Sequence, residues 1–163
     1  MVLINPSLEY KTIRDAILTL LRASKDTLNT GLTSGKFTDN EQIACGYPVY
    51  AMIDNPKYPL LYIKWVGKDE AFRELGHAGR KIPSVIFKLY AVTRNKISKT
   101  DSDDEVMLLV RNIEAVFRDN IEIPSSGILY SILGNNRSAT ADLDRGFSVD
   151  VAEIDLTCIV EVK

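Results

Sequence analysis

Acidic residues near the C-terminus are the ones whose types and spacing come closest to a chemical site. Asp142 and Asp144 lie two positions apart, so they would share one face of a strand, and Asp150, Glu153 and Asp155 follow. Carboxylate oxygens in such a cluster can hold Mg²⁺ for phosphoryl hydrolysis. Acidic residues that alternate with apolar ones are, however, more typical of the solvent face of a strand. We favour this second interpretation, and a metal-dependent nuclease stays open as an alternative.

The single histidine, His77, lies in a glycine-rich and charged segment with no serine or cysteine constellation around it. A solvated loop histidine is the favoured interpretation over a general base. The sequence contains no G-x-S-x-G motif, no P-loop and no G-x-G-x-x-G motif. We therefore expect no catalytic residues, no bound metal and no cofactor.

Charge is distributed unevenly along the chain. Residues 64–99 hold nine basic and three acidic side chains, a local charge of +6, whereas residues 100–163 hold five basic and thirteen acidic ones, a local charge of −8. Aromatic side chains that could stack on single-stranded bases accompany the basic segment, namely Tyr58, Tyr62, Trp65, Phe72 and Tyr90. Packing within the fold explains most of them better. The opposite charges suit head-to-tail contact between copies, or they neutralise each other within one fold.

The composition is that of an ordinary globular domain. The chain has 163 residues, of which 45% are apolar and 26% charged, so we expect a single α+β domain over residues 1–163. No apolar run approaches the roughly 20 residues needed to cross a bilayer, and Asn5-Pro6 ends the short N-terminal one. Cys45 and Cys158 stand alone and are expected to be reduced thiols in a cytoplasm.

The first half of the chain predicts a helix followed by strands. Apolar residues at helical spacing predict a helix over about 6–28, and a loop follows to residue 46. The β-rich segments 47–53 and 59–66 flank the turn sequence Asp54-Asn55-Pro56, which favours a hairpin. Residues 67–82 carry three glycines and seven charges and are expected to form a long loop. Residues 84–93 then alternate as a strand does.

The second half predicts another helix and further strands. Ser102-Asp103-Asp104-Glu105 has the pattern of a capping box, and an apolar stripe continues from it to about Asp119. A short apolar segment, 128–133, precedes a polar strand or arm at 134–146. These elements predict an α+β fold, with a mainly antiparallel sheet and two helices packed on one face.

The last strand, 147–162, is unusually long for a sheet of this size. Its apolar residues stand at odd positions from 147 to 151 and at even positions from 154 to 162. Because side chains alternate along a strand, this change of parity predicts a β-bulge near Ala152-Glu153. An overlong strand also leaves an edge that invites pairing with another chain.

The order of these elements resembles that of the tail terminator proteins of long-tailed bacteriophages. The matching elements are the N-terminal helix Leu8–Leu28, the hairpin strands 47–66, the long loop, the strand 84–93, the helix opened by Ser102-Asp103-Asp104-Glu105, and a terminal hairpin that ends in the strand 147–162. The resemblance covers nearly the whole chain, and the size also matches.

The resemblance implies a structural virion protein. It implies a homohexameric ring, assembled in the host cytoplasm, that caps the finished tail tube, stops its polymerisation and docks the head connector. It also implies a sheet inside the ring and helices outside, with the loop 67–82, the arm 134–146 and the strand 147–162 at contacts. The candidate subunit or ring contacts are Lys68, Arg73, Arg80, Lys81, Asp142, Asp144, Arg145 and Asp150.

An acidic lumen formed by Asp142, Asp144 and Asp150 would let DNA pass through the ring without specific binding, because it repels phosphates. A head–tail neck or completion protein is the alternative within the same biology. A metal-dependent nuclease and a nucleic-acid-binding module are the alternatives from other classes.

Overall fold

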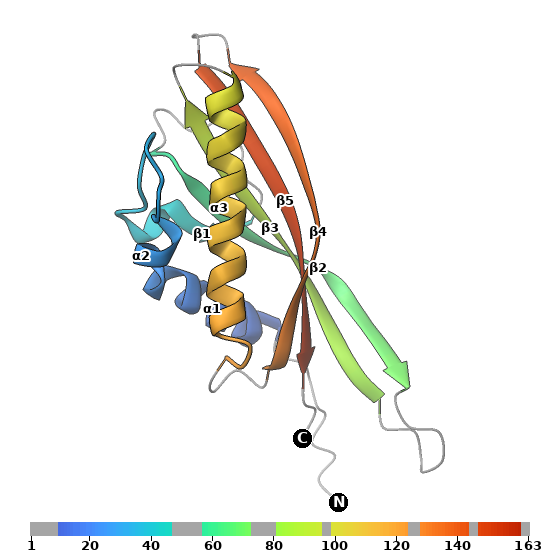
Figure 1. The fold of residues 1–163 in the computed structure, drawn as a ribbon. Helices are drawn as coiled ribbons and strands as arrows, with labels where there is room; N and C mark the ends of the chain where they lie inside the picture. Colours follow the sequence, from blue (N-terminus) through green and yellow to red (C-terminus); the bar gives the residue numbers. More distant parts are fainter. Residues whose placement is uncertain are drawn as a thin grey trace, which may run out of the picture.

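Helices cover one face of a five-stranded, mainly antiparallel sheet (Figure 1). The structure is a computed structural model and describes residues 10–46, 57–72, 81–95, 99–123, 128–143 and 147–160. The α+β fold class predicted from the sequence is therefore confirmed.

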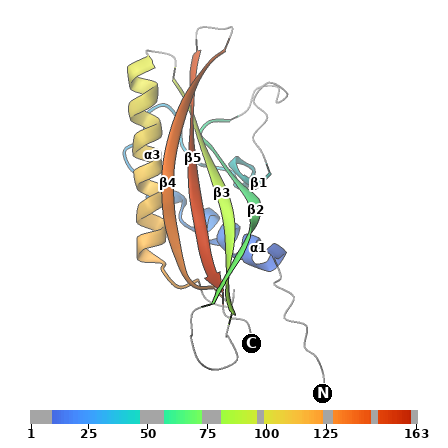
Figure 2. The ribbon, with the colours of Figure 1, turned by 90° about the vertical axis from the view of Figure 1, so that its right-hand side faces the viewer.

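The strands follow the order β1-β2-β3-β5-β4 across the sheet, and Figure 2 shows them side by side, with α3 beside β4 and α1 behind the strands. Their bounds are β1 Ile43–Cys45, β2 Leu60–Phe72, β3 Lys81–Asn95, β4 Ile128–Leu143 and β5 Phe147–Val160. β1 runs parallel to β2, and the other neighbouring pairs are antiparallel. It follows that β2 and β4 run in opposite directions.

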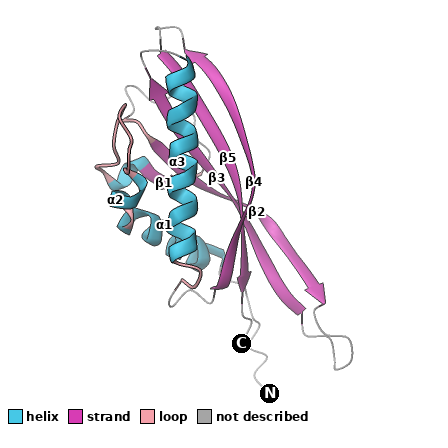
Figure 3. Ribbon diagram, viewed as in Figure 1, coloured by secondary structure: helices cyan, strands magenta, loops and turns pink. Residues whose placement is uncertain are grey.

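The helices of the described residues lie together on one side of the sheet (Figure 3). They are α1 (Tyr10–Ala23), α2 (Lys25–Leu28) and α3 (Lys99–Asp119). The apolar stripes expected from the sequence face the sheet and build the main core, with Ile17 and Leu21 of α1 and Leu109 and Ile113 of α3 fully buried. The predicted first helix still ends at Leu28, but it is interrupted between α1 and α2.

The segment predicted as a long loop, 67–82, is in part a β-hairpin. β2 and β3 stay paired from Leu60 opposite Val92 to Phe72 opposite Lys81, so residues 67–72 and 81–82 belong to strands. Figure 1 shows this end of the hairpin extending away from α3. Backbone pairing with β3 makes these residues a strand. The sequence does not predict it, because Lys68 and Asp69, on opposite faces, are both polar and the alternation of apolar and polar residues that marks a strand is missing. Residues 73–80 lie outside the described residues.

The segment predicted as an arm, 134–146, is mostly strand as well. Residues 134–143 continue β4, which pairs with β5 as far as Leu143 opposite Phe147. The apolar segment 128–133 and the polar segment are thus one edge strand, and residues 144–146 lie outside the described part.

The bulge predicted near Ala152-Glu153 is wrong. β5 pairs with β3 in one unbroken register from Ile159 to Ser148, whereas the two register shifts of its other pairing lie in β4, between Ile128 and Tyr130 and at residues 134 and 135, which stand opposite Asp155. The change of parity has another cause. Even-numbered residues of β5 such as Ile154 enter the main core, but Val149 is buried in a second cluster on the opposite face of the sheet.

The start of the second helix also differs from the prediction. α3 begins at Lys99, before the proposed capping box, and the carboxylate of Glu105 is not used as a cap. It accepts hydrogen bonds instead from the backbone N–H and hydroxyl groups of Thr33 and Ser34, in the segment that follows α2. Glu105 therefore joins α3 to the N-terminal helices.

The predicted hairpin of 47–53 with 59–66 has its first half outside the described residues. The second half lies in β2, whose described neighbours are β3 and, over Leu61 to Ile63, the short parallel strand β1. β1 and the short 3-10 helix Asn40–Gln42 replace the end of the predicted 30–46 loop. The Gln42 side chain fixes this turn by donating to the carbonyls of Lys36 and Pro59.

Candidate self-assembly interface

The residues predicted as subunit contacts do not come together in one place. Lys68 is exposed on β2 opposite Val85, and Lys81 begins β3 at the same end of the sheet. Asp142 pairs with Ser148 near the other end. The remaining candidates, apart from Asp150, lie outside the described residues, namely Arg73, Arg80, Asp144 and Arg145.

Asp150 lies inside the fold rather than on its surface. Its exposed fraction is 1%, and it stands opposite Thr93, which is buried to the same extent. A side chain with this exposure offers no surface to a neighbouring subunit or to DNA in a lumen. The expectation that Asp150 forms a subunit contact is therefore corrected.

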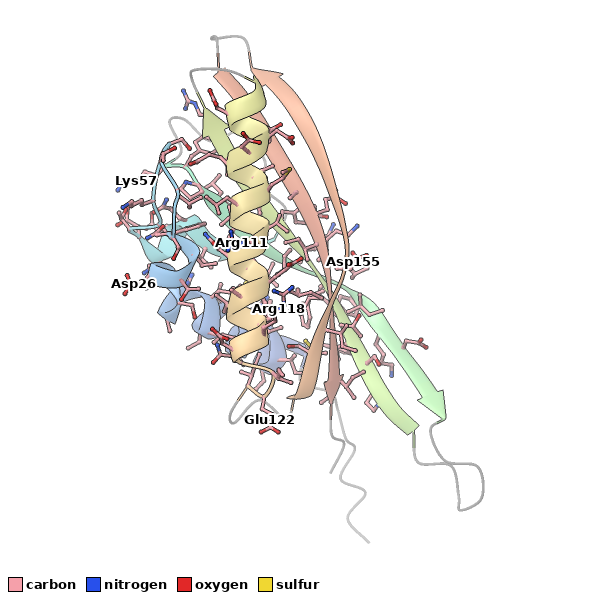
Figure 4. All side chains as sticks on the ribbon, in the orientation of Figure 1. Asp26, Lys57, Arg111, Arg118, Glu122 and Asp155 are labelled. Carbon is pink, nitrogen blue, oxygen red and sulfur yellow. The ribbon has the colours of Figure 1, made fainter. Side chains whose placement is uncertain are left out.

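The acidic residues of β5 point to different faces of the sheet. Asp150 lies on the helix side, whereas alternation places Glu153 and Asp155 on the other side, where Figure 4 shows Asp155 projecting away from α3. Glu153 accepts a hydrogen bond of 3.2 Å from Nζ of Lys88. The described residues contain no group of three or more His, Cys, Asp and Glu that could hold a metal ion.

The charge asymmetry of the sequence becomes an asymmetry across the sheet. The basic segment supplies β2 and β3, and the acidic segment supplies α3, β4 and β5. The ion pair of Lys88 with Glu153 lies where the two segments meet, and its hydrogen bond raises the pKa of Lys88. Part of the opposite charge is thus neutralised within the fold.

One open edge of the sheet is the outer side of β2. β1 covers this side only over Leu61 to Ile63 in the described residues, which leaves residues 64–72 without a described partner on that side. Trp65 and Val66 stand here, 48% and 53% exposed. Val66 is the bulged residue of the pairing with β3, and the Trp65 ring rests against Tyr10 of α1 at 5.1 Å between centroids.

The other open edge is β4, whose one strand neighbour among the described residues is β5. A groove of about 390 Å³ separates this strand from the C-terminal end of α3. Its apolar lining includes Phe117, Ile121 and Leu133, and the ion pair of Arg118 with Glu114, 3.2 Å long, lies at its rim. Figure 4 shows Arg118 near this end of α3.

Exposed apolar side chains concentrate at these two edges. Five large hydrophobic side chains are strongly exposed in the described residues, and all but Met107 lie on the two edge strands or in the groove beside β4. The four are Trp65, Val66, Ile121 and Ile132. Contiguous exposed apolar surface usually marks an interaction site. Sequence reasoning missed these residues because their exposure depends on which strand lies at an edge.

Both cysteines are free thiols, as expected. Cys158 is fully buried in β5, and burial raises its pKa to about 12. Cys45 in β1 is half-buried, and burial raises its pKa as well. Neither thiol has the lowered pKa that marks a reactive cysteine.

No helix in the described part of the chain is long and apolar enough to span a membrane. Comparison of the sequence with protein-family models gives no match, and no curated protein matches it. The surfaces described above are therefore the basis for a functional proposal.

Proposed function

We propose that this chain is a structural protein that assembles head to tail into a ring. The observation that carries the proposal is the position of four exposed apolar side chains at the two outer edges of the sheet, on strands β2 and β4 and at the groove beside β4, in the described residues. Two different surfaces that fit each other give a heterologous contact, which closes into a ring when the rotation between copies allows it.

Strand direction supports this mode of assembly. Because β2 and β4 run in opposite directions, a copy added beside β4 in the same orientation would offer its β2 as an antiparallel partner. The added copy would also keep its helices on the same side of the growing sheet. An antiparallel joint satisfies the backbone groups of both edges without inverting either subunit.

The ring is, in this proposal, the terminator of a bacteriophage tail. It caps the finished tube of tail-tube protein, ends polymerisation and docks the head connector, while DNA passes through without specific binding. The similar order of elements and the size of the chain support this assignment. No catalytic step, metal or cofactor is part of it, and its place is in the virion tail.

Mass in solution tests the proposal. Light scattering over a range of protein and salt concentrations, with electron microscopy of the same samples, should give closed rings of one size. Adding the protein to polymerising tail-tube protein should then shorten the tubes and leave a ring at one end. A chain that stays monomeric alone and also leaves tube length unchanged would refute the proposal.

A head–tail neck protein would give rings that bind the connector and leave tube length unchanged. A nucleic-acid-binding module would instead bind DNA with an affinity that falls steeply with salt. These outcomes separate the alternatives in the same set of samples.

A further inference from the structure

We propose that the joint between neighbouring subunits is formed by Trp65 and Val66 of one copy, which fill the groove between α3 and β4 of the next copy. This inference rests on the proposed function, because it specifies the contact that would hold the ring together. The occupant of the groove is thus a second copy of this chain, and the docking segment is the outer edge of β2.

The docking segment is shaped as an apolar projection. Trp65 lies on the helix side of β2, opposite the buried Phe87, yet almost half of its surface is exposed. Contact with the ring of Tyr10 holds one side of the indole in place. Val66, the next residue, is displaced from the ladder by the bulge and is more exposed still. Ordered aromatic side chains of this kind are common anchors of interfaces.

The groove offers a matching receptor. Its volume of about 390 Å³ lies in the range of sites that enclose small molecules, which leaves room for an indole ring. Ile121, 55% exposed, and Leu133 contribute apolar surface, and polar groups at the rim surround it. An apolar centre with a polar rim is the usual arrangement of a protein–protein contact.

Charge favours a second copy as the occupant. The exposed side chains Lys64 and Lys68 flank Trp65 on the β2 edge. The end of α3 and the turn after it, beside the groove, carry Asp119 and Glu122, both exposed. Lys64 and Lys68 of one copy can therefore meet Asp119 and Glu122 of the next, and Asp69 beside Lys68 can meet Arg118 at the groove. Such complementary pairs steer and orient contacts. A foreign partner at the groove would leave the apolar β2 edge unexplained.

Trp65 is the only tryptophan of the chain, so its fluorescence reports directly on this joint. In the wild-type protein, assembly followed by light scattering should coincide with a blue shift of the emission and with protection from iodide quenching. Rings that form without any change in emission or quenching would overturn the joint and leave the proposed ring intact. Failure to form rings, both alone and on tail-tube protein, would overturn both.

Substitutions at the two surfaces provide the second arm of the test. Ile121→Asp should raise the protein concentration needed for assembly by roughly tenfold or more, as the loss of an interface anchor does. The control is Met107→Asp, since Met107 is exposed on α3, the helix that precedes Ile121, and lies outside the lining of the groove. Its assembly should stay within about twofold of the wild type. Equal effects of the two variants would overturn the joint.

A double-mutant cycle checks that the two surfaces meet. Trp65→Ala and Ile121→Ala should each weaken assembly, and their combination should weaken it by clearly less than the product of the single effects. Circular dichroism must give the wild-type spectrum for each variant, because Trp65 also contacts Tyr10 within the subunit. Fully multiplicative effects in folded variants would overturn the contact.

Discussion

Glu105 should be the polar residue whose replacement most weakens the packing of the helices. It is 6% exposed, and it accepts hydrogen bonds from the backbone N–H of Thr33 at 2.5 Å and from the Thr33 hydroxyl at 3.0 Å. Ser34 donates its N–H and its hydroxyl to the same carboxylate. We expect Glu105→Gln to loosen the contact between α3 and the segment after α2.

The size of the effect follows from these bonds. Hydrogen bonds to a charged acceptor contribute about 1.5–3 kcal/mol each, and glutamine keeps one oxygen acceptor while it turns an amide donor toward other donors. Thr33 and Ser34 are exposed, so water replaces part of what is lost. We therefore expect Glu105→Gln to lower the free energy of unfolding by about 2 kcal/mol, or the melting temperature by about 4–8 °C.

The dependence on pH distinguishes this explanation from a general packing defect. Burial alone would raise the pKa of Glu105, but the hydrogen bonds from Ser34 and Thr33 outweigh it, so the net pKa is lowered. Since the folded pKa lies below the unfolded value of about 4.3, the stabilisation is complete above that pH and is lost as pH falls through the folded pKa. The difference between wild type and variant should shrink accordingly.

Urea unfolding at pH 7 and at pH 3, followed by circular dichroism, measures both quantities. Asp104→Asn is the matched control, because Asp104 is an exposed acid on the same helix and its change should stay within about 0.5 kcal/mol. A Glu105→Gln variant as stable as the control at pH 7, or one equally destabilised at both pH values, would refute the reasoning.

Two further predictions concern close packing and thiol reactivity. Gly35→Ala should destabilise the fold by about 1–3 kcal/mol in urea unfolding, since its Cβ would collide with the backbone carbonyl of Tyr58. Gly67→Ala, whose Cβ would meet no atom within 4 Å, serves as the control, and an equal loss in both variants would contradict the prediction. Iodoacetamide at pH 8 should alkylate Cys45 in the native protein and Cys158 only after unfolding, because burial raises the pKa of Cys158 to about 12. Mass spectrometry of the labelled peptides checks this, and equal labelling of both thiols in the native state would be inconsistent with it.

The helices and the central strands were predictable because their burial is periodic. Ile113 and Val116 of α3 follow the spacing of an amphipathic helix, and both are buried in the core. The start of α3 was not predictable in the same way. The pattern of Ser102 to Glu105 fits a capping box, but Glu105 finds its partners in a segment far away in the sequence. A local pattern does not distinguish these two uses of one carboxylate.

The misplaced bulge shows why parity alone does not fix the shape of a strand. A change of parity implies a bulge only where a single face of the sheet is buried. Here Val149 and Val92 are buried on the face opposite the helices, while Ile154 is buried on the face that the helices cover. Odd-numbered and even-numbered apolar residues of β5 are thus both buried without a bulge in β5. Which face a residue enters depends on the neighbouring strand.

The extent of β2 was underestimated for a related reason. Beyond Val66 the strand carries Gly67, Lys68 and Asp69, with no apolar alternation that would mark it as a strand. Pairing with β3 nevertheless continues to Phe72. The candidate interface on β2 was not predictable from the sequence for the same reason. Which strand lies at an edge depends on the order of strands across the sheet, and long-range pairing sets that order.

The open edge of β2 has an identifiable origin in the chain. Gly46 donates its N–H to the carbonyl of Ile63 at 2.8 Å and has a φ of +112°, a backbone conformation that favours glycine. At this residue the parallel pairing of β1 ends, and the β2 edge beyond Ile63 is left open on that side in the described residues. Proteins often protect such edges with lysines and bulges, and both occur here at Lys64, Val66 and Lys68.

Protection alone does not explain the composition of that edge. An edge built only to prevent pairing would be polar throughout, yet Trp65 and Val66 are exposed at its centre. Bulges in both edge strands, at Val66 in β2 and before Tyr130 and Asn136 in β4, restrict the registers in which the two edges can pair. Lysines and bulges would therefore exclude unspecific partners, while the apolar centre favours the one surface that fits. This combination is expected of an edge selected for one defined partner.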